Sequence, residues 1–387
     1  MRKAIGFIGK TILIVVALMC LAVTIIPRFL DRIYYTGPES EHFDSARFFN
    51  PDGEDTVKVP SGGSRGAFLM SRIVGADGAV EWPKTVSVTP SIPQPRVAGA
   101  AMTATWVGHA TVLIQTGGLN ILTDPVWSDR SGPFDLGPKR VTEPGIRFDD
   151  LPKIDMILVS HNHYDHMDLA TIKRLWDRDK PLIITSLGND TLIRGTGAKV
   201  VALDWGGRVA AGPDVEVIAT RNHHWSSRWF TDRNRALWSS FVVRLPGGNI
   251  FFAGDTGFGD GQWGVEAAAY GPVRLALIPI GAFRFRPGQM DTGSHIGPIQ
   301  AERIFSSLGA SYAIPIHWGT FKLSDEARET PPKMLAEVMK CAGYPYRTAF
   351  SAIDVGVPVA VPAYRKPVPQ LAPDPACLAR KEIVGLP

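Results

Sequence analysis

Short runs of apolar and β-branched residues recur between residues 102 and 316, and polar or glycine-rich turns separate them. Runs of this length and composition predict β-strands. The expected strands are Met102–Val107, Thr111–Ile114, Leu119–Pro125, Ile154–Val159, Pro181–Ser186, Lys199–Leu203, Val215–Thr220, Leu237–Arg244, Ile250–Ala253, Leu275–Ile280 and Tyr312–Ile316. Apolar residues at helical spacing predict helices at Leu169–Asp177, Gln262–Tyr270, Pro298–Leu308 and Pro332–Cys341. Strands with interspersed helices predict a layered α/β architecture.

The first 30 residues have a different pattern. Residues 11–26 are almost wholly apolar and follow Arg2, Lys3 and Lys10, which predicts a membrane-targeting segment. As a helix, this run would cover only ~24 Å of a ~30 Å hydrocarbon layer, so flanking residues would have to contribute to a span. No small-residue cleavage site follows it, which favours an uncleaved transmembrane anchor over a cleaved signal peptide. The preceding basic residues then place the rest of the chain outside the cytoplasm.

These patterns divide the chain into four parts. Residues 1–30 are the membrane anchor or signal-anchor, and 31–100 are an irregular lead-in with one short helix around Ser45–Phe49. Residues 101–350 form the main globular domain, and the Pro-rich residues 351–387 form an extended tail.

Composition excludes some classes of protein. The net charge of +4 is small for 387 residues, and no long Lys/Arg run is present, so nucleic acid is not an expected partner. The three cysteines, Cys20, Cys341 and Cys377, are too few and too scattered for a disulfide framework. A disulfide between Cys341 and Cys377 is compatible with the sequence, but nothing in the sequence supports it. The sequence does not decide the oligomeric state, and a homodimer is compatible with it.

The densest candidate chemistry lies in Ser160–His166, directly after the predicted strand Ile154–Val159. His161, His163, Asp165 and His166 place four potential metal ligands within six residues, and Asp168 is the expected N-cap of the following helix. Imidazole and carboxylate ligands suit zinc and similar ions. A lone histidine is more often structural than a ligand, but three histidines and an aspartate at this spacing favour a metal site.

This His-x-His-x-Asp-His motif after a strand resembles the metallo-β-lactamase superfamily. The resemblance implies a four-layer αβ/βα sandwich, in which two central mixed sheets are flanked by helices. It also implies three later ligands, each at the end of a strand, and the matching residues are His224, Asp255 and His317. His223 is an alternative to His224. The implied site holds two zinc ions, one on His161, His163 and His224, the other on Asp165, His166 and His317, with Asp255 bridging. Two cations ~3.5–4 Å apart can hold a bridging hydroxide for hydrolysis.

A narrower resemblance is to the family of phospholipase D enzymes that hydrolyse N-acylphosphatidylethanolamine. It covers roughly residues 100–350 and is carried by Trp106–Thr111, Leu122–Pro125, Gly137–Arg140, Ser160–Asp168, Leu203–Trp205, Phe251–Gly257, Ile278–Ala282 and Ile316–Phe321. It implies a zinc phosphodiesterase that releases phosphatidic acid from a membrane phospholipid, with Asp165 and His295 as catalytic groups. His109 and Asp124 would orient the ligands, although Asp124 is also an ordinary turn residue before proline. Gly297-Pro298 replaces the acidic run that follows the family's counterpart of His295.

Phosphate also needs a cationic clamp, and Arg284 and Arg286 lie in the loop before His295. The alternative interpretation is that both arginines are ordinary solvent-exposed loop residues. A lactonase or β-lactamase of the same superfamily is the alternative enzyme. A nuclease of this fold is less favoured, because the sequence lacks the extra basic domain expected for binding nucleic acid. A non-catalytic envelope protein with a structural metal is a further alternative, but structural zinc sites are closed four-ligand cages. The expected partners are therefore a phospholipid substrate and the membrane.

Overall fold

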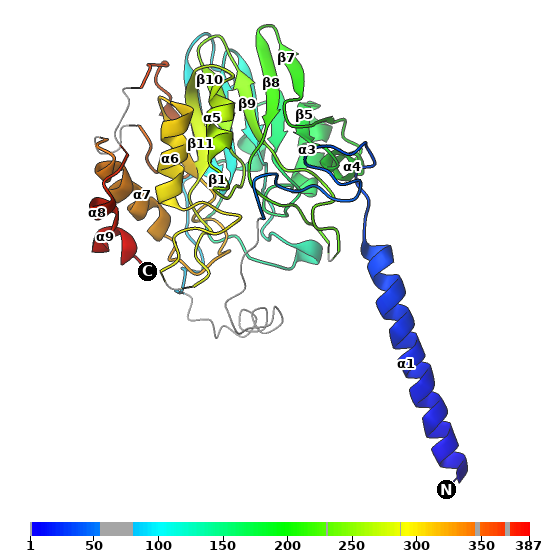
Figure 1. The fold of residues 1–387 in the computed structure, drawn as a ribbon. Helices are drawn as coiled ribbons and strands as arrows, with labels where there is room; N and C mark the ends of the chain where they lie inside the picture. Colours follow the sequence, from blue (N-terminus) through cyan, green and yellow to red (C-terminus); the bar gives the residue numbers. More distant parts are fainter. Residues whose placement is uncertain (1, 55–79, 230, 287, 345–348, 368–371) are drawn as a thin grey trace.

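Two β-sheets lie face to face at the centre of the molecule, and helices cover their outer faces (Figure 1). This computed structural model describes the chain except for residues 1, 55–79, 230, 287, 345–348 and 368–371. The layered α/β architecture expected from the sequence is confirmed.

The first sheet has the order β13-β1-β2-β3-β4-β5-β6 within the described residues. The antiparallel part consists of β1 (Met102–Gly108), β2 (Thr111–Thr116), β3 (Leu119–Thr123) and β13 (Pro358–Ala360). From β3 onward the pairing is parallel, through β4 (Met156–Val159), β5 (Leu182–Ser186) and β6 (Val201–Leu203). The sheet is therefore mixed, and its parallel strands end at one edge.

The second sheet has the order β12-β11-β10-β9-β8-β7 in the same part of the chain. Its antiparallel strands are β7 (Arg208–Gly212), β8 (Val215–Thr220), β9 (Ser240–Arg244) and β10 (Asn249–Phe252). The pairing becomes parallel at β11 (Val273–Pro279) and β12 (Ala313–Ile316). Strand β7 was not predicted, because most of its side chains after Arg208 are small and they alternate between exposed and half-buried at the edge of the sheet.

The strands have two buried faces, which explains why they are almost continuously apolar. In β2, Val112 and Ile114 face the core between the sheets, whereas Leu113 packs toward Ile172 and Leu175 of α3. Helices α3 (Leu169–Asp179) and α4 (Asn189–Arg194) belong to the first half of the molecule. Helices α5 (Gln262–Ala268), α6 (Pro298–Leu308) and α7 (Thr330–Cys341) belong to the second. This alternation produces four layers.

Helix α1 (Arg2–Leu30) extends away from the sandwich (Figure 1). Its apolar side chains from Ile12 to Ile25 are mostly exposed. Among the helices in the described portion of the chain, none is both long and apolar enough to cross a membrane, so the expected transmembrane helix is not found.

The lead-in packs on the body instead of forming the short helix expected at Ser45–Phe49. Phe43 forms isolated β-bridges with Ser40 and Phe48. Both phenylalanines are buried against Leu237 and Trp238, so tertiary packing overrides the weak local helical pattern. The rest of the predicted lead-in includes residues 55–79, which lie outside the described residues.

The C-terminal segment is more ordered than the predicted extended tail. Strand β13 adds to the edge of β1, and a disulfide joins Cys341 of α7 to Cys377 of α8 (Pro375–Leu378). Ile383 of α9 (Lys381–Val384) is buried beside Phe283. These contacts are made across large sequence separations, which local patterns do not reveal.

Candidate metal centre

The histidine loop between β4 and α3 is fixed at its helical end by Asp168. One carboxylate oxygen of Asp168 accepts hydrogen bonds from the backbone N–H groups of Ala170 and Thr171, as predicted for an N-cap. The other oxygen accepts hydrogen bonds from Ser128 N (3.0 Å) and Thr171 Oγ1 (2.6 Å). The loop therefore begins at a buried strand and ends at a capped helix.

Asp124, at the end of β3, fixes the other end of the same loop. Its Oδ1 accepts a hydrogen bond from Ser160 N (2.7 Å), and its Oδ2 lies 2.6 Å from both Ser160 Oγ and His166 Nδ1. A carboxylate on Nδ1 selects the tautomer that leaves Nε2 of His166 free to bind a metal. This is the geometry that the orienting role predicted for Asp124 requires.

One cluster of candidate ligand atoms comes from His161, His163, His224 and Asp255, and these atoms lie within 4.8 Å of one another. His161 Nε2 and His163 Nδ1 are 2.8 Å apart and face the same point. His224 follows β8, and its Nδ1 donates to Ser294 O at 2.9 Å. His223 is not in this cluster, because its ring contacts Asp52 at 2.8 Å instead. The geometry thus favours His224 over His223.

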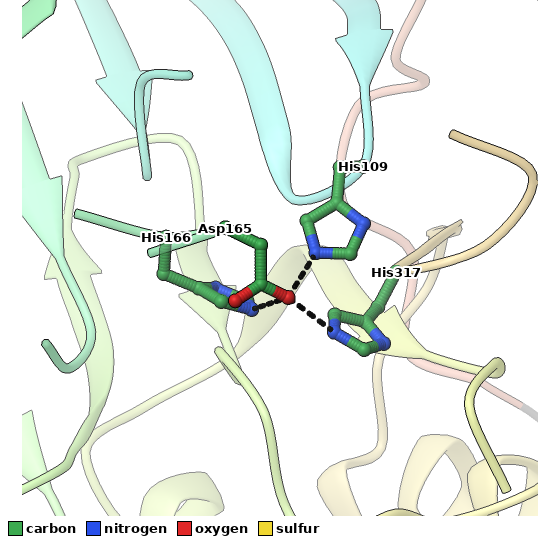
Figure 2. Close-up of side chains that lie close together, drawn as sticks. All are labelled: His109, Asp165, His166 and His317. Atoms are coloured by element: carbon green, nitrogen blue, oxygen red, sulfur yellow. Dashed lines mark hydrogen bonds and ion pairs between the residues drawn. The ribbon is translucent and has the colours of Figure 1, made fainter. Parts of the chain in front are cut away.

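A second cluster is formed by Asp165, His166 and His317 together with His109 (Figure 2). Asp165 Oδ2 lies 3.0 Å from His109 Nε2, 3.6 Å from His166 Nε2 and 3.7 Å from His317 Nε2. His109, expected only to orient ligands, therefore presents a candidate ligand atom itself.

Asp255, at the end of β10, lies between the two clusters. Its Oδ2 is 2.9 Å from His317 Nε2 and 3.1 Å from His166 Nε2. The same oxygen is 3.9 Å from His224 Nε2 and 3.8 Å from Nδ1 of His295. Its position is the one that a bridging carboxylate would need, and His295 lies beside it, as the predicted catalytic role requires.

Burial and neighbouring carboxylates shift the pKa values of these histidines in different directions. Burial disfavours the charged imidazolium and holds the pKa of His161 and His224 well below its usual range. Burial likewise lowers the pKa of His295 to about 4. For His317, burial opposes protonation, but the carboxylates of Asp255 and Asp165 raise its pKa to about 9. Without a metal, His317 of the second cluster therefore retains a proton, which metal binding must displace.

The donor set fits metal ions. Among the described residues, Nε2 of His224 and Oδ1 of Asp255 are buried without a hydrogen-bond partner, and Nε2 of His166 and of His317 approach Asp255 Oδ2 without hydrogen-bond geometry. Unsatisfied buried polar atoms are costly and rare, and several converging on one point indicate an ion that would satisfy them. Neutral imidazole with carboxylate is a donor set for zinc, iron and similar ions.

The two predicted phosphate-binding arginines are not brought to the clusters. Arg284 is buried, and its guanidinium donates to the carbonyls of Gln289 (3.1 Å) and Leu386 (2.6 Å). Arg286 is exposed. Their contact with substrate therefore stays a prediction, without support from the arrangement of Arg284.

Sequence reasoning missed two polar residues next to the ligands. Arg228 donates from Nη1 to the carbonyls of Asn162 (3.0 Å) and Met167 (2.8 Å), within and after the histidine loop. Asn50 hydrogen-bonds the backbone of His224. Neither residue belongs to a motif, and more than 60 residues separate each from the groups that it holds, so no local signal could have identified them.

Comparisons with known proteins identify similar sequences and a similar fold. A family model for the beta-lactamase superfamily domain matches residues 119–318. The N-acyl-phosphatidylethanolamine-hydrolyzing phospholipase D 1 of Caenorhabditis elegans is 34% identical over 265 residues, which are 65% of this chain and 74% of that protein. A metallo hydrolase of the archaeon Ignicoccus hospitalis shares the fold, with a TM-score of 0.51 and 19% identity over 67% of this chain and 98% of that one.

An uncharacterized protein of Mycobacterium tuberculosis is 34% identical over 241 residues. The matched region is 60% of this chain and 63% of the mycobacterial protein, so this chain spans less than two thirds of that relative's length.

The second cluster predicts the effect of replacing Asp165 by Asn. Asparagine keeps the size of the side chain but removes the carboxylate that faces three imidazoles. We expect weaker metal binding and a turnover lower by roughly 100-fold or more, the scale seen when a group that stabilises transition-state charge is lost. Metal titration and steady-state kinetics measure both.

The exposed Asp149→Asn is the matched control, and circular dichroism checks folding. A folded Asp165→Asn protein with unchanged metal affinity and turnover would contradict the assignment. If the variant does not fold, Asp165 serves primarily to stabilise the fold.

Proposed function

The chain belongs to the β-lactamase superfamily and is a metal-dependent hydrolase, and from this premise we propose that it is a dinuclear zinc phosphodiesterase of the phospholipase D type. The proposed substrate is N-acylated phosphatidylethanolamine or a related membrane phospholipid. The Caenorhabditis relative, which is named for this activity, supports the choice. Water would attack phosphorus, the bond to the head-group oxygen would break, and phosphatidic acid and an N-acylated ethanolamine would leave.

The observation that carries the proposal is the position of Asp255 between two ligand clusters. Two zinc ions held there would supply a nucleophilic hydroxide and neutralise the charge that develops on the phosphoryl oxygens. A phosphodiester brings its own negative charge, which suits a site of this kind.

His295 supplies a further group for this reaction. Its ring lies 5.3 Å from that of His224 and 5.2 Å from that of His317, measured between centroids, so it borders both clusters. Because burial lowers its pKa to about 4, the ring is neutral at pH 7 and can donate one hydrogen bond without carrying charge. We assign it to the phosphoryl oxygens or the leaving oxygen.

A cavity of about 320 Å³ next to the histidine loop supports a lipid substrate. Its lining combines aromatic and aliphatic side chains with two arginines: Arg32, Tyr34, Phe134, Tyr164, Leu169, Leu192, Arg228 and Trp229, with Gly132 and Pro133. Tyr164 stands between ligands His163 and Asp165 in the loop, and Arg228 packs over its ring at 4.0 Å. Apolar walls suit an acyl chain, and guanidinium groups suit a phosphate.

We also propose that residues 31–387 lie outside the cytoplasm and that the N-terminal segment holds the protein at the membrane. Arg2, Lys3 and Lys10 precede the apolar run, as expected for a cytoplasmic N-terminus. The Cys341–Cys377 disulfide supports this location, because disulfides persist in oxidising compartments and are rare in the cytosol.

The dinuclear part of the proposal predicts two zinc ions per chain. Metal-free protein titrated with zinc should bind two equivalents, and elemental analysis of the purified protein should give the same count. Turnover should follow occupancy of the second site, because Asp255 belongs to one cluster and also lies within 3.1 Å of His166 and His317 in the other. One ion per chain with full activity at saturating zinc would exclude the dinuclear mechanism.

The proposed substrate can be tested by identifying the products of its hydrolysis. N-acylated phosphatidylethanolamine dispersed in detergent should yield phosphatidic acid, detected by mass spectrometry. Phe134→Ala should raise KM for the lipid about 5-fold, by removing roughly 1 kcal/mol of apolar contact, without changing turnover of a soluble bis-aryl phosphodiester.

Val265→Ala, which shortens another exposed apolar side chain, is the matched control. Efficient hydrolysis of a lactone or β-lactam, with no phosphodiester product under any lipid presentation, would assign the alternative reaction to the same centre.

The topology prediction can be tested in a bacterium that expresses the chain. Protease added to intact spheroplasts should digest the catalytic domain while a cytoplasmic marker stays whole. Digestion only after lysis would place the domain inside the cell and overturn the proposed location.

A further inference from the structure

The segment of residues 31–54, called the arm below, runs from the end of α1 across the body to the loop that carries His224. It is tied down along its length. Asp31 pairs with Arg235, with Nε and Oδ1 3.0 Å apart, and Tyr34 donates its hydroxyl to Asp232 Oδ2 at 2.8 Å. Phe43 and Phe48 are buried in a small core with Trp238. The arm is therefore a fixed part of the body, and it precedes the region that the family model matches.

Asn50, near the end of the arm, is almost fully buried and makes three hydrogen bonds. Its Nδ2 donates to His224 O at 2.8 Å, and its Oδ1 accepts from His224 N at 3.2 Å. The same oxygen accepts from Trp238 Nε1 at 3.1 Å. One amide side chain thus satisfies both backbone polar groups of a candidate metal ligand.

Asp52 holds the preceding residue. Its Oδ1 lies 2.8 Å from His223 Nδ1, and its Oδ2 accepts a hydrogen bond from Asp260 N at 3.0 Å. Arg221 Nη1 lies 3.3 Å from the same carboxylate oxygen. The arm therefore binds the loop at two successive residues, and one of them is the ligand.

These contacts determine where the His224 ring can be. Its own Nδ1 is held by Ser294 O at 2.9 Å, so the remaining freedom of the ring is that of its backbone. Asn50 removes that freedom, which directs Nε2 toward His161, His163 and Asp255. By contrast, the groups that hold Asp165, His166 and His317 come from other segments, including Asp124 and His109.

We propose that Asn50 is a positioning residue for His224, and that the arm thereby sets the metal affinity of the cluster of His161, His163 and His224 but not that of the other cluster. The inference rests on the proposed two-metal centre. Partners of metal-binding histidines change metal affinity about 10- to 100-fold when they are lost, and the same scale is expected here.

The experiment is a zinc titration of the metal-free full-length protein against a chromophoric chelator, which resolves the two binding steps without any turnover assay. Asn50→Ala should weaken one step by about 10- to 100-fold and leave the other within about 2-fold. Asn50→Leu keeps the buried volume but removes the same hydrogen bonds, so it should weaken the same zinc-binding step. If the Ala variant does not fold, the zinc titration of the Leu variant tests the inference.

Two control variants separate positioning from stability. Trp238→Phe removes only the third hydrogen bond of Asn50 and perturbs the same core, so it should lower the thermal midpoint of the metal-free protein without changing either zinc affinity. Glu39→Ala changes an exposed contact elsewhere on the arm, with Ser45, and should alter neither quantity.

Unchanged zinc binding in both Asn50 variants, an equal loss at both steps, or the same loss in Trp238→Phe would overturn the inference. If the unaltered protein binds one zinc ion, the two-metal centre fails instead. If it binds two ions but does not hydrolyse the lipid, the proposed substrate fails and the positioning role of Asn50 stands.

Discussion

The burial of two carboxylates among imidazole rings is the constraint on which this end of the molecule depends. Asp255 is fully buried and Asp165 is mostly buried, and an isolated buried charge would cost several kcal/mol. Neighbouring imidazoles, His166 first among them, outweigh burial and hold the pKa of both carboxyls well below the usual range. The compensating groups follow strands of both sheets, so the two halves of the sandwich must stay in register for the charges to balance.

Backbone strain is concentrated at the same place. His109, Asp124 and His317 have φ values of 53°, 29° and 61°, in the left-handed region that side chains other than glycine avoid. Each such residue costs about 1–3 kcal/mol, so the surrounding contacts must enforce it. One of these contacts is direct, because His317 N donates to His109 O at 3.0 Å and joins the β1–β2 turn to the end of β12. Strain at three groups of one constellation is typical of a functional site.

Much of the sandwich and of the candidate site followed from local sequence. All eleven expected strands are present, with ends that differ by up to three residues, because runs of apolar residues alone indicate them. The histidine loop was apparent because its ligands are contiguous, whereas His224, Asp255 and His317 required a resemblance, since each stands alone after its strand. Contacts between residues far apart in the sequence could not be predicted from local patterns. Strand β13 pairs with β1 across more than 250 residues, and Asn50 hydrogen-bonds His224 across 174. The hydrogen bond from Arg284 to the carbonyl of Leu386 spans 102 residues, so local sequence could not indicate it either.

Side chains that line the proposed lipid cavity also hold the histidine loop, so binding in the cavity and binding at the metal centre are coupled. Arg228 lines the cavity and also holds the carbonyls of Asn162 and Met167 in the histidine loop. Tyr34 lines it as well, and its hydroxyl binds Asp232, whose carboxylate accepts hydrogen bonds from the backbone N–H of Arg228. A ligand in the cavity would therefore contact the same groups that fix the metal ligands. Binding free energies at two coupled sites are reciprocal, so if an acyl chain stabilises this arrangement of the loop, metal ions in the centre must strengthen binding of the acyl chain to the same degree.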